Sequence, residues 1–192
     1  MNNIGVIELL SAYCQGYFPM ADEENGEISW YSPELRAIFP IEKIKPPKSL
    51  LKELTKNPME CTVNNDFEAV IHFCSSREIT WISAEIIEMY CELHKLGFAH
   101  SIETWQNGEI VGGLYGVSIG GAFFGESMFN TISNASKVAF YFLIERLKNR
   151  NFSLLDSQFM NDFTAQLGAI EIPQKDYLRK LQIAIFQNCS FI

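Results

Sequence analysis

Hydrophobic and polar residues alternate most regularly between residues 99 and 130, where two glycine-containing turns divide the stretch into three segments. Asn107-Gly108 separates the first segment from the second, and Gly120-Gly121 separates the second from the third. Residues of these types readily adopt the positive φ angles that a tight hairpin turn requires. The pattern predicts an antiparallel meander of three strands, at residues 99–105, 109–118 and 122–129.

Four glycines lie inside the predicted strands and not at their turns: Gly112, Gly113, Gly116 and Gly125. A glycine within a strand costs backbone entropy and contributes no side-chain packing. Each of these positions therefore indicates a β-bulge, or a close approach by a ligand or another chain. We expect a functional site near this meander.

Apolar residues at helical spacing predict helices around the meander. Ser83 and either Asn65 or Asp66 are suited to cap helices at their N-termini, and Gly16 and Gly97 are suited to end them. The helices are expected at residues 4–15, 47–57, 67–74, 83–96, 135–150, 161–168 and 174–187.

Shorter apolar segments predict additional strands at 61–64, 152–156 and 169–173. Two segments near the N-terminus, 28–33 and 36–40, are predicted to pair with each other as a small β-hairpin. Because helices alternate with strands of mainly antiparallel type, the sequence favours an α/β (α+β) fold with a mixed sheet.

The composition changes between residues 41 and 58, where lysines gather around Pro46-Pro47. A chain of 192 residues can form one domain with a small satellite. We therefore predict a small N-terminal domain at 1–58 and a larger domain at 59–192. On their own, the lysines most simply form a solvated helix face. They are Lys43, Lys45, Lys48, Lys52 and Lys56.

Composition and charge exclude several classes of protein. Hydrophobic residues make up 47% of the chain and charged residues 20%, as in globular proteins and unlike disordered ones. The formal charge of −8 argues against non-specific binding to nucleic acid, including DNA, and favours cationic partners. Five scattered cysteines without a C-x-x-C pair indicate reduced thiols in a cytoplasmic protein. The N-terminus has no apolar stretch of spanning length, so no membrane passage is expected.

Candidate chemistry lies at the ends of two apolar strands. Glu126 follows Gly125, and Asp156 ends the segment 152–156, with Gln158 two residues further on. A carboxylate beside such apolar runs is costly to bury unpaired, so a role in amine binding or proton transfer is plausible. A buried pair with Lys137 or with backbone amides explains the same carboxylates equally well.

Other chemistries find little support in the residue pattern. The three histidines lack metal-binding spacing, so no metal site is expected. Ser127 is not part of a G-x-S-x-G motif, and no phosphate-binding glycine loop of Walker or Rossmann type is present. The apolar residues near 123–128 and 140–143 suit either a core or a ligand pocket.

Several ordered motifs resemble the leucyl/phenylalanyl-tRNA protein transferase family, and together they span almost the whole chain. They are GYFPM at 16–20, W-x-S-P-x-x-R-x-I-x-P at 30–40, F-x-x-V-I at 67–71, TWI at 80–82, LHKLGFAHSIETW at 93–105, VGGLYGV at 111–117, GESMF at 125–129, NASK at 134–137 and LLDSQ at 154–158. The resemblance implies a bacterial, cytoplasmic enzyme with a GNAT-like acyltransferase domain behind a small N-terminal domain. Such an enzyme transfers Leu or Phe from aminoacyl-tRNA to proteins with N-terminal Arg or Lys, marking them for degradation by the N-end rule.

The resemblance also assigns roles to individual residues. Asp156 and Gln158 would orient and help deprotonate the attacking amine, and Glu126 would contact that amine or the cationic acceptor. An apolar pocket for the transferred side chain would consist of Leu114, Phe123, Met128, Phe140 and Leu143. The 3′ adenosine of the tRNA would stack on Trp81, Tyr90 and Tyr13. The tRNA backbone would contact Lys43, Lys45, Lys48, Lys52 and Lys56.

An aminoacyl ester is already activated, so the resemblance implies no cofactor and no metal, and we expect a monomer. Two other functions remain open from the residues alone. One is a GNAT N-acyltransferase that uses acyl-CoA, and the other is a non-catalytic adaptor that recognises basic N-termini.

Overall fold

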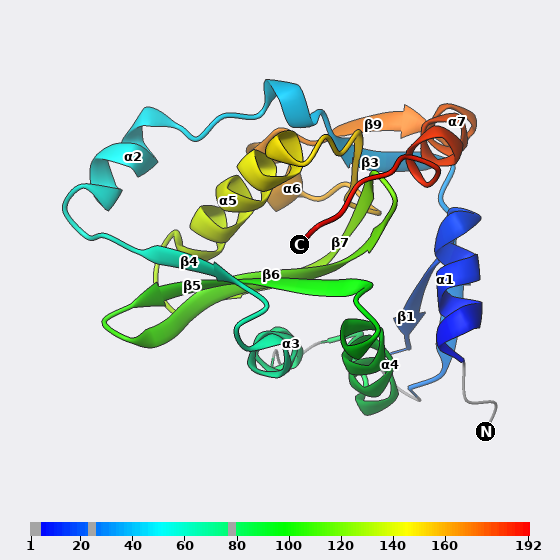
Figure 1. Ribbon diagram of the computed structural model, residues 1–192, viewed down its shortest axis with the longest axis horizontal. Coiled ribbons are helices and arrows are strands. Elements are labelled where there is room, and N and C mark those ends of the chain that lie inside the picture. Colours follow the sequence, from blue (N-terminus) through cyan, green and yellow to red (C-terminus); the bar gives the residue numbers. More distant parts are fainter. Residues whose placement is uncertain (1–4, 23–25, 77–79) are drawn as a thin grey trace.

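A computed structural model describes residues 5–22, 26–76 and 80–192. Its main feature is a seven-stranded sheet with the order β4-β5-β6-β7-β8-β3-β9, beside a separate two-stranded sheet of β1 and β2. Figure 1 shows α5 and α6 on one side of the large sheet and α3 and α4 on the other. The predicted fold class, α/β with a mixed and mainly antiparallel sheet, is confirmed.

The strands are β1 Phe18–Ala21, β2 Ile28–Tyr31, β3 Leu35–Phe39, β4 Glu60–Val63, β5 Ala99–Gln106, β6 Glu109–Ile119, β7 Ala122–Asn130, β8 Leu154–Asp156 and β9 Ile170–Pro173. The helices are α1 Val6–Cys14, α2 Lys48–Leu54, α3 Phe67–Ser75, α4 Ala84–Lys95, α5 Ala135–Asn149, α6 Asp162–Leu167 and α7 Gln174–Ala184, with a 3₁₀ turn, η1, at Ile41–Lys43. Every predicted helix has a counterpart. The first helix was predicted to begin at residue 4, and Ile4 lies outside the described residues.

The meander predicted from the alternating pattern is confirmed as β5, β6 and β7, which pair antiparallel in that order. Asn107 and Gly108 both have positive φ, 53° and 83°, as the tight turn requires. The predicted caps also form, because the side chain of Asp66 accepts a hydrogen bond from Ala69 N and that of Ser83 accepts one from Ile86 N. Local signals in the sequence were therefore sufficient for these elements.

Two of the strand glycines have clear structural causes. A Cβ on Gly112 would lie 2.6 Å from Cβ of Ala135, so this glycine allows α5 to pack directly on β6. Near Gly116 the register of β6 and β7 shifts, since Tyr115 faces Ser127 whereas Gly116 faces Gly125. The residue between those two partners, Glu126, is therefore the extra residue of a β-bulge.

Two clusters of buried apolar residues cover the two faces of the large sheet. One cluster joins the sheet to α1, α3, α4 and α7, and it includes Tyr90 and Phe124. The other joins the sheet to α5, η1 and the C-terminal segment, and it includes Phe123 and Phe140. Adjacent residues of β7 thus point into different clusters, as the alternation of side chains along a strand requires.

The predicted hairpin of residues 28–33 and 36–40 is wrong. β2 pairs with β1, while β3 enters the large sheet between β8 and β9. Both segments have the composition of strands, but their partners come from elsewhere in the chain, which local pattern does not reveal. The division of the chain at residue 58 stays a prediction, and β3 forms part of the large sheet although it precedes that boundary.

Candidate active site

The candidate site lies where the only parallel pairing among the described strands ends. β7 and β8 run parallel, and their register covers Ala122–Phe124 against Leu154–Asp156. Beyond this register lies a cavity of about 640 Å³, lined by residues from β6, the rest of β7, α5, and the segments around β8 and α6. One part of its lining is polar and includes Glu126, Ser127 and Gln158. The other part is mostly apolar and includes Leu114, Met128, Phe140, Leu143, Leu155 and Leu167.

Glu126, the extra residue of the bulge, is a carboxylate in the lining of this cavity and is 9% exposed. Its Oε1 accepts a hydrogen bond of 2.6 Å from Tyr13 Oη. Its Oε2 accepts bonds of 3.1 Å from Tyr90 Oη and 2.9 Å from Gln158 Nε2. A carboxylate has about four acceptor sites. The bonds within the described part of the chain use three of them, which leaves one on Oε1 for a substrate.

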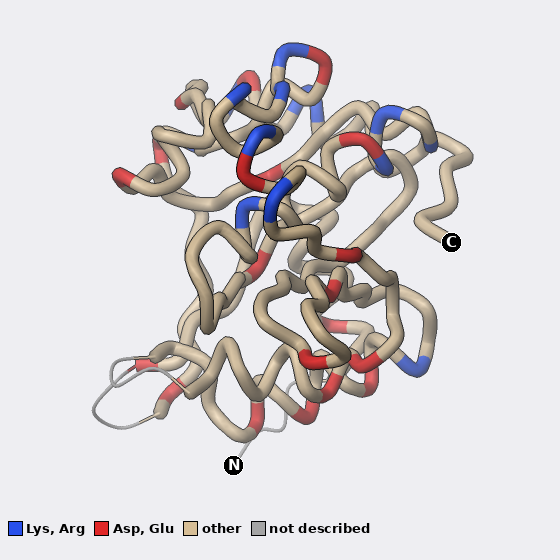
Figure 2. The backbone as a smooth tube through the Cα atoms, turned by 90° about the vertical axis from the view of Figure 1, so that its left-hand side faces the viewer, with Lys and Arg blue, Asp and Glu red and all other residues tan. Residues whose placement is uncertain are grey.

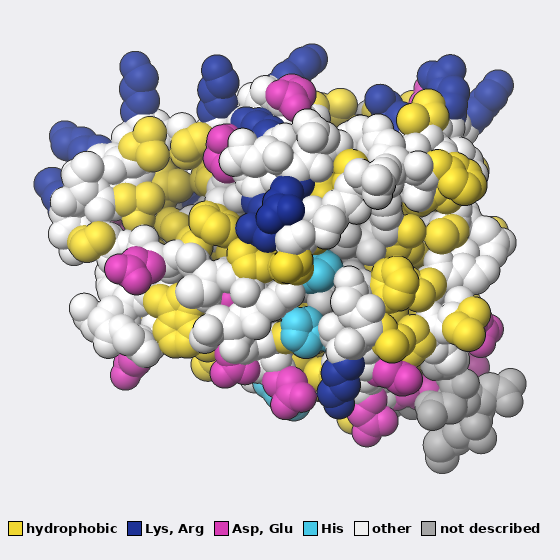
Figure 3. Space-filling model, in the orientation of Figure 1, with side chains coloured by type: hydrophobic (Ala, Val, Ile, Leu, Met, Phe, Trp, Pro, Cys, Tyr) yellow, Lys and Arg dark blue, Asp and Glu magenta, His cyan; other side chains and the backbone are white. Residues whose placement is uncertain are grey.

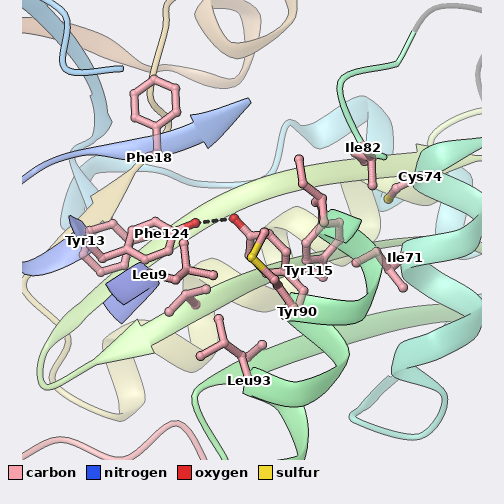
Figure 4. Packing of buried hydrophobic residues seen from close by; sticks show 14 of the residues in the cluster. Leu9, Tyr13, Phe18, Ile71, Cys74, Ile82, Tyr90, Leu93, Tyr115 and Phe124 are labelled. Atoms are coloured by element: carbon pink, nitrogen blue, oxygen red, sulfur yellow. Dashed lines mark hydrogen bonds between the residues drawn. The ribbon is translucent and has the colours of Figure 1, made fainter. Parts of the chain in front are cut away.

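Tyr13 and Tyr90 also contact each other through their hydroxyl groups, which approach from α1 and α4 (Figure 4). Together with Glu126 they form a ring of three oxygen-to-oxygen contacts. Burial raises the pKa of Glu126 to about 7, opposed by the bonds from Tyr13 and Gln158. The carboxylate therefore exchanges a proton near neutral pH, as a catalytic base should.

Asp156, the second predicted carboxylate, is only 1% exposed and forms an ion pair with Arg36. Arg36 donates from Nε to Oδ1 over 2.9 Å and from Nη2 to Oδ2 over 2.6 Å. Tyr177 Oη donates to Oδ2 over 2.7 Å, and Gln158 N donates to Oδ1 over 2.9 Å. The partners of Asp156 are therefore Arg36, Tyr177 and the backbone amide of Gln158. Of the partners that the sequence left open, a backbone amide is present, whereas Lys137 is not among these bonds.

Neither Arg36 nor Tyr177 was identified as a site residue from the sequence. A signal for Arg36 was present, because a cation within the apolar strand R-x-I-x-P is costly to bury unless it is paired. Nothing in the local pattern indicated which acid would pair with it. Tyr177 lies on an amphipathic helix and carried no comparable signal.

Four of the five predicted pocket residues line the cavity, and one does not. Leu114, Met128, Phe140 and Leu143 all contribute to its lining. Phe123 is fully buried outside that lining, where its ring stacks on Phe191 with centroids 5.0 Å apart. Phe123 and Phe140 nevertheless belong to the same apolar cluster.

The three predicted adenosine-stacking residues occupy different places. Trp81 lines the cavity and is partly exposed. Tyr13 and Tyr90 are 0% exposed, so neither ring offers a face to a nucleobase in this structure. For these two residues the stacking role needs correction. Their hydroxyl groups hold Glu126 instead.

The five predicted tRNA-contacting lysines are all exposed, on η1, on α2 and in the adjoining loops. In Figure 3, dark blue side chains project at the left end and along the left part of the upper edge, over η1 and α2 of Figure 1, and others project at the upper right, over α7. Figure 2 shows most acidic positions in the opposite half, which contains α3 and α4. The overall negative charge therefore coexists with a separate basic surface.

Two properties of the described residues bear on other classes of function. No helix in that part of the chain is long and apolar enough to cross a membrane. The same residues contain no group of three or more His, Cys, Asp or Glu side chains placed to hold a metal ion.

Comparison with known proteins adds an independent line of evidence. A family model described as "Leucyl/phenylalanyl-tRNA protein transferase" matches residues 38–182, and one described as the N-terminal domain of that protein matches residues 7–34. The leucyl/phenylalanyl-tRNA--protein transferase of Gloeobacter violaceus is 49% identical over 183 residues, which cover 95% of each chain. That of Chlorobaculum parvum is 48% identical over 193 residues, covering 98% of this chain and 100% of its own.

A solved structure, titled a conserved protein of unknown function from Bacteroides thetaiotaomicron, resembles the fold. It aligns with a TM-score of 0.50 at 12% identity, over 96% of this chain and 64% of its own. At this identity the likeness concerns the fold alone.

Proposed function

The chain belongs to the leucyl/phenylalanyl-tRNA protein transferase family, and from this we propose that it transfers Leu or Phe to proteins that begin with Arg or Lys. The family name gives aminoacyl-tRNA as the donor and a protein as the acceptor. In the reaction the acceptor α-amine attacks the ester carbonyl. A C–N bond forms, the ester C–O bond to the ribose breaks, and the tRNA hydroxyl group leaves with a proton.

The position of Glu126 is the observation that carries this proposal. The attacking amine must be neutral, and it must lose a second proton as the peptide bond forms. Glu126 lines the cavity with one acceptor site available, and its pKa of about 7 suits exchange with an amine. We assign it the role of accepting the amine proton.

The apolar part of the cavity suits the transferred side chain. Leu114, Phe140 and Leu143 are each less than 5% exposed, and Met128 adds a flexible wall. A site of this composition favours Leu and Phe through the burial of apolar area. Because the polar part with Glu126 adjoins it, the ester carbonyl of a bound aminoacyl group would lie near the attacking amine.

The distribution of charge suits the two larger substrates. The exposed lysines on η1 and α2 would contact the tRNA backbone, which is a sequence-independent interaction. Trp81 at the cavity would stack on the 3′ adenosine, a contact that tolerates any base. The cationic side chain of the acceptor would be attracted by Glu126 and by the overall negative charge. Transfer would mark the acceptor for degradation by the N-end rule, in the bacterial cytoplasm and with the enzyme as a monomer.

Transfer of labelled leucine from Leu-tRNA to four peptides, beginning with Arg, Lys, Asp or Ala, tests the proposal. We expect label on the Arg and Lys peptides only. Label on all four peptides, or on none, would contradict the proposed acceptor specificity. Binding of Arg peptides without transfer would support an adaptor, and transfer of an acyl group from acyl-CoA would support a GNAT N-acyltransferase.

A further inference from the structure

Arg36 is the most enclosed cation among the described residues and lies on β3, beside the strand that carries Asp156. Its guanidinium carbon is 4.4 Å from the ring centroid of Phe18 and 4.6 Å from that of Tyr177. Its Nη1 donates to the carbonyl of Gly16 over 3.1 Å, at the end of α1. Burial disfavours the charged form of Arg36, but the carboxylate of Asp156 outweighs this and raises its pKa. The guanidinium of Arg36 is therefore a fixed positive charge that is paired with the carboxylate of Asp156.

The hydrogen bonds to the Asp156 carboxylate leave it no acceptor site for a substrate. Its Oδ1 accepts from Arg36 Nε and from Gln158 N, both at 2.9 Å. Its Oδ2 accepts from Arg36 Nη2 and from Tyr177 Oη. These four bonds use all of the roughly four acceptor sites that a carboxylate offers. An amine in the cavity has no free lone pair on this carboxylate to which it could give a proton.

The hydrogen bond that Asp156 accepts from Gln158 N helps to fix the backbone conformation of Gln158. Gln158 has a φ of 61°, a left-handed conformation that is unusual for a residue with a Cβ atom. Two bonds hold it there: its N–H donates to Asp156 Oδ1, and its carbonyl accepts from Ala37 N over 3.0 Å. In this conformation its side-chain Nε2 reaches Glu126 Oε2 at 2.9 Å. The backbone geometry thus sets where the amide of Gln158 points.

We propose that Arg36 is a positioning residue for the transfer reaction, acting through Asp156 and the backbone of Gln158 on Glu126. Asp156 then contributes a fixed acceptor and not a proton-accepting base. This inference rests on the proposed function, in which Glu126 takes the amine proton. It changes the role that the resemblance implied for Asp156, and it makes β3 part of the catalytic support.

The test measures single-turnover transfer from saturating Leu-tRNA to an Arg peptide, together with Leu-tRNA affinity, pH dependence and thermal melting. We expect Arg36→Gln to lower the transfer rate at least tenfold while the dissociation constant of Leu-tRNA stays within threefold. The midpoint of its pH–rate profile should rise, because removal of the cation leaves the Asp156 charge acting alone on Glu126. Arg36→Lys keeps a buried charge but cannot hold both carboxylate oxygens. It should also lose rate, and it decides the question if Arg36→Gln does not fold.

Asp156→Asn distinguishes positioning from proton transfer, since an amide oxygen can still accept from Gln158 N. Positioning predicts that this variant transfers at least tenfold faster than Asp156→Ala. Equal rates for the two variants would show that the acceptor for Gln158 N does not set the rate, and would overturn the proposal. Arg179→Gln is the matched control, because it makes the same substitution at an exposed arginine of α7, whose ion pair with Asp176 lies outside this network. We expect its rate within threefold of wild type.

Arg36 variants that melt earlier but keep the transfer rate and the pH midpoint of wild type, at a temperature where all variants are folded, would also overturn the proposal. Failure of the wild-type protein to transfer leucine would instead refute the proposed function. The two failures therefore give different results in the same assay.

Discussion

Replacement of Glu126 by Gln tests whether the carboxylate binds a proton near neutral pH. The amide is a close mimic of the neutral acid in the ring described above. Its NH₂ group can donate to Tyr13, Tyr13 to Tyr90, and Tyr90 to the amide oxygen, which also accepts from Gln158. The variant should therefore fold without leaving a buried polar group unpaired.

The expected change in stability follows from the pKa of Glu126. Burial raises that pKa from 4.5 to about 7. Between these values the folded protein holds a proton that the unfolded chain has released, so the free energy of unfolding falls as pH rises. Each pKa unit corresponds to about 1.4 kcal/mol, so the decrease reaches about 3 kcal/mol between pH 4.5 and 7. Glu126→Gln has no such proton and should escape this decrease.

Urea unfolding of both proteins at intervals between pH 4.5 and 8 measures the effect. All other titrating groups are common to the two proteins, so their difference isolates Glu126. We expect Glu126→Gln to become more stable relative to wild type as pH rises, while its transfer rate falls about 10²- to 10⁴-fold, as for removal of a general base. Parallel stability profiles would refute the assigned ionisation. An undiminished rate would refute the catalytic role.

Three other predictions concern the pocket, the basic surface and the sheet. Met128→Ala removes part of the apolar wall, so the KM for Leu-tRNA should rise about tenfold, and an unchanged KM in the transfer assay would contradict the pocket assignment. Replacement of both Lys48 and Lys52 by Ala should make the slope of log affinity for Leu-tRNA against log salt shallower by about one for each lysine–phosphate interaction that is removed, whereas parallel slopes would place the tRNA elsewhere. Gly112→Ala forces α5 away from β6 and should destabilise the protein by about 1–3 kcal/mol in urea unfolding. Gly5→Ala, whose Cβ meets nothing within 4 Å, is its steric control and should cost no more than about 1 kcal/mol, because Ala is a poorer N-cap of α1 than Gly.

The elements that the sequence predicted correctly are those that local chemistry determines. The turns at Asn107-Gly108 and Gly120-Gly121 depend on residues that accept positive φ, and both turns form as predicted. The cap at Ser83 depends on one side chain and one nearby amide. The position of β3 could not be predicted in this way, because its partners β8 and β9 lie more than a hundred residues further along the chain.

The site residues divide in the same manner. The sequence singled out Glu126, Asp156 and Gln158 because carboxylates and amides beside apolar strands need partners, and hydrogen bonds join all three in the structure. The roles of Tyr13 and Tyr90 could not be predicted from pattern. An aromatic ring that stacks on a base and one that delivers a buried hydroxyl have the same appearance in a sequence. Only their complete burial distinguishes the two uses.

The site depends on two irregularities of the sheet that meet near Gly125. The bulge inserts Glu126 between the partners of Tyr115 and Gly116, so that Phe123 and Met128, five residues apart, belong to the same apolar cluster. In a regular strand, residues five apart point to opposite faces, and Met128 would be absent from the pocket. The end of the register between β7 and β8 at Phe124 then opens the space that the bulged residue enters. If the strand were fully paired, the bulge would bury the Glu126 carboxylate against the neighbouring strand. If the strand pairing ended without a bulge, the open space would contain no carboxylate. A cavity that joins an acid to an apolar pocket therefore requires both the bulge and the end of the pairing.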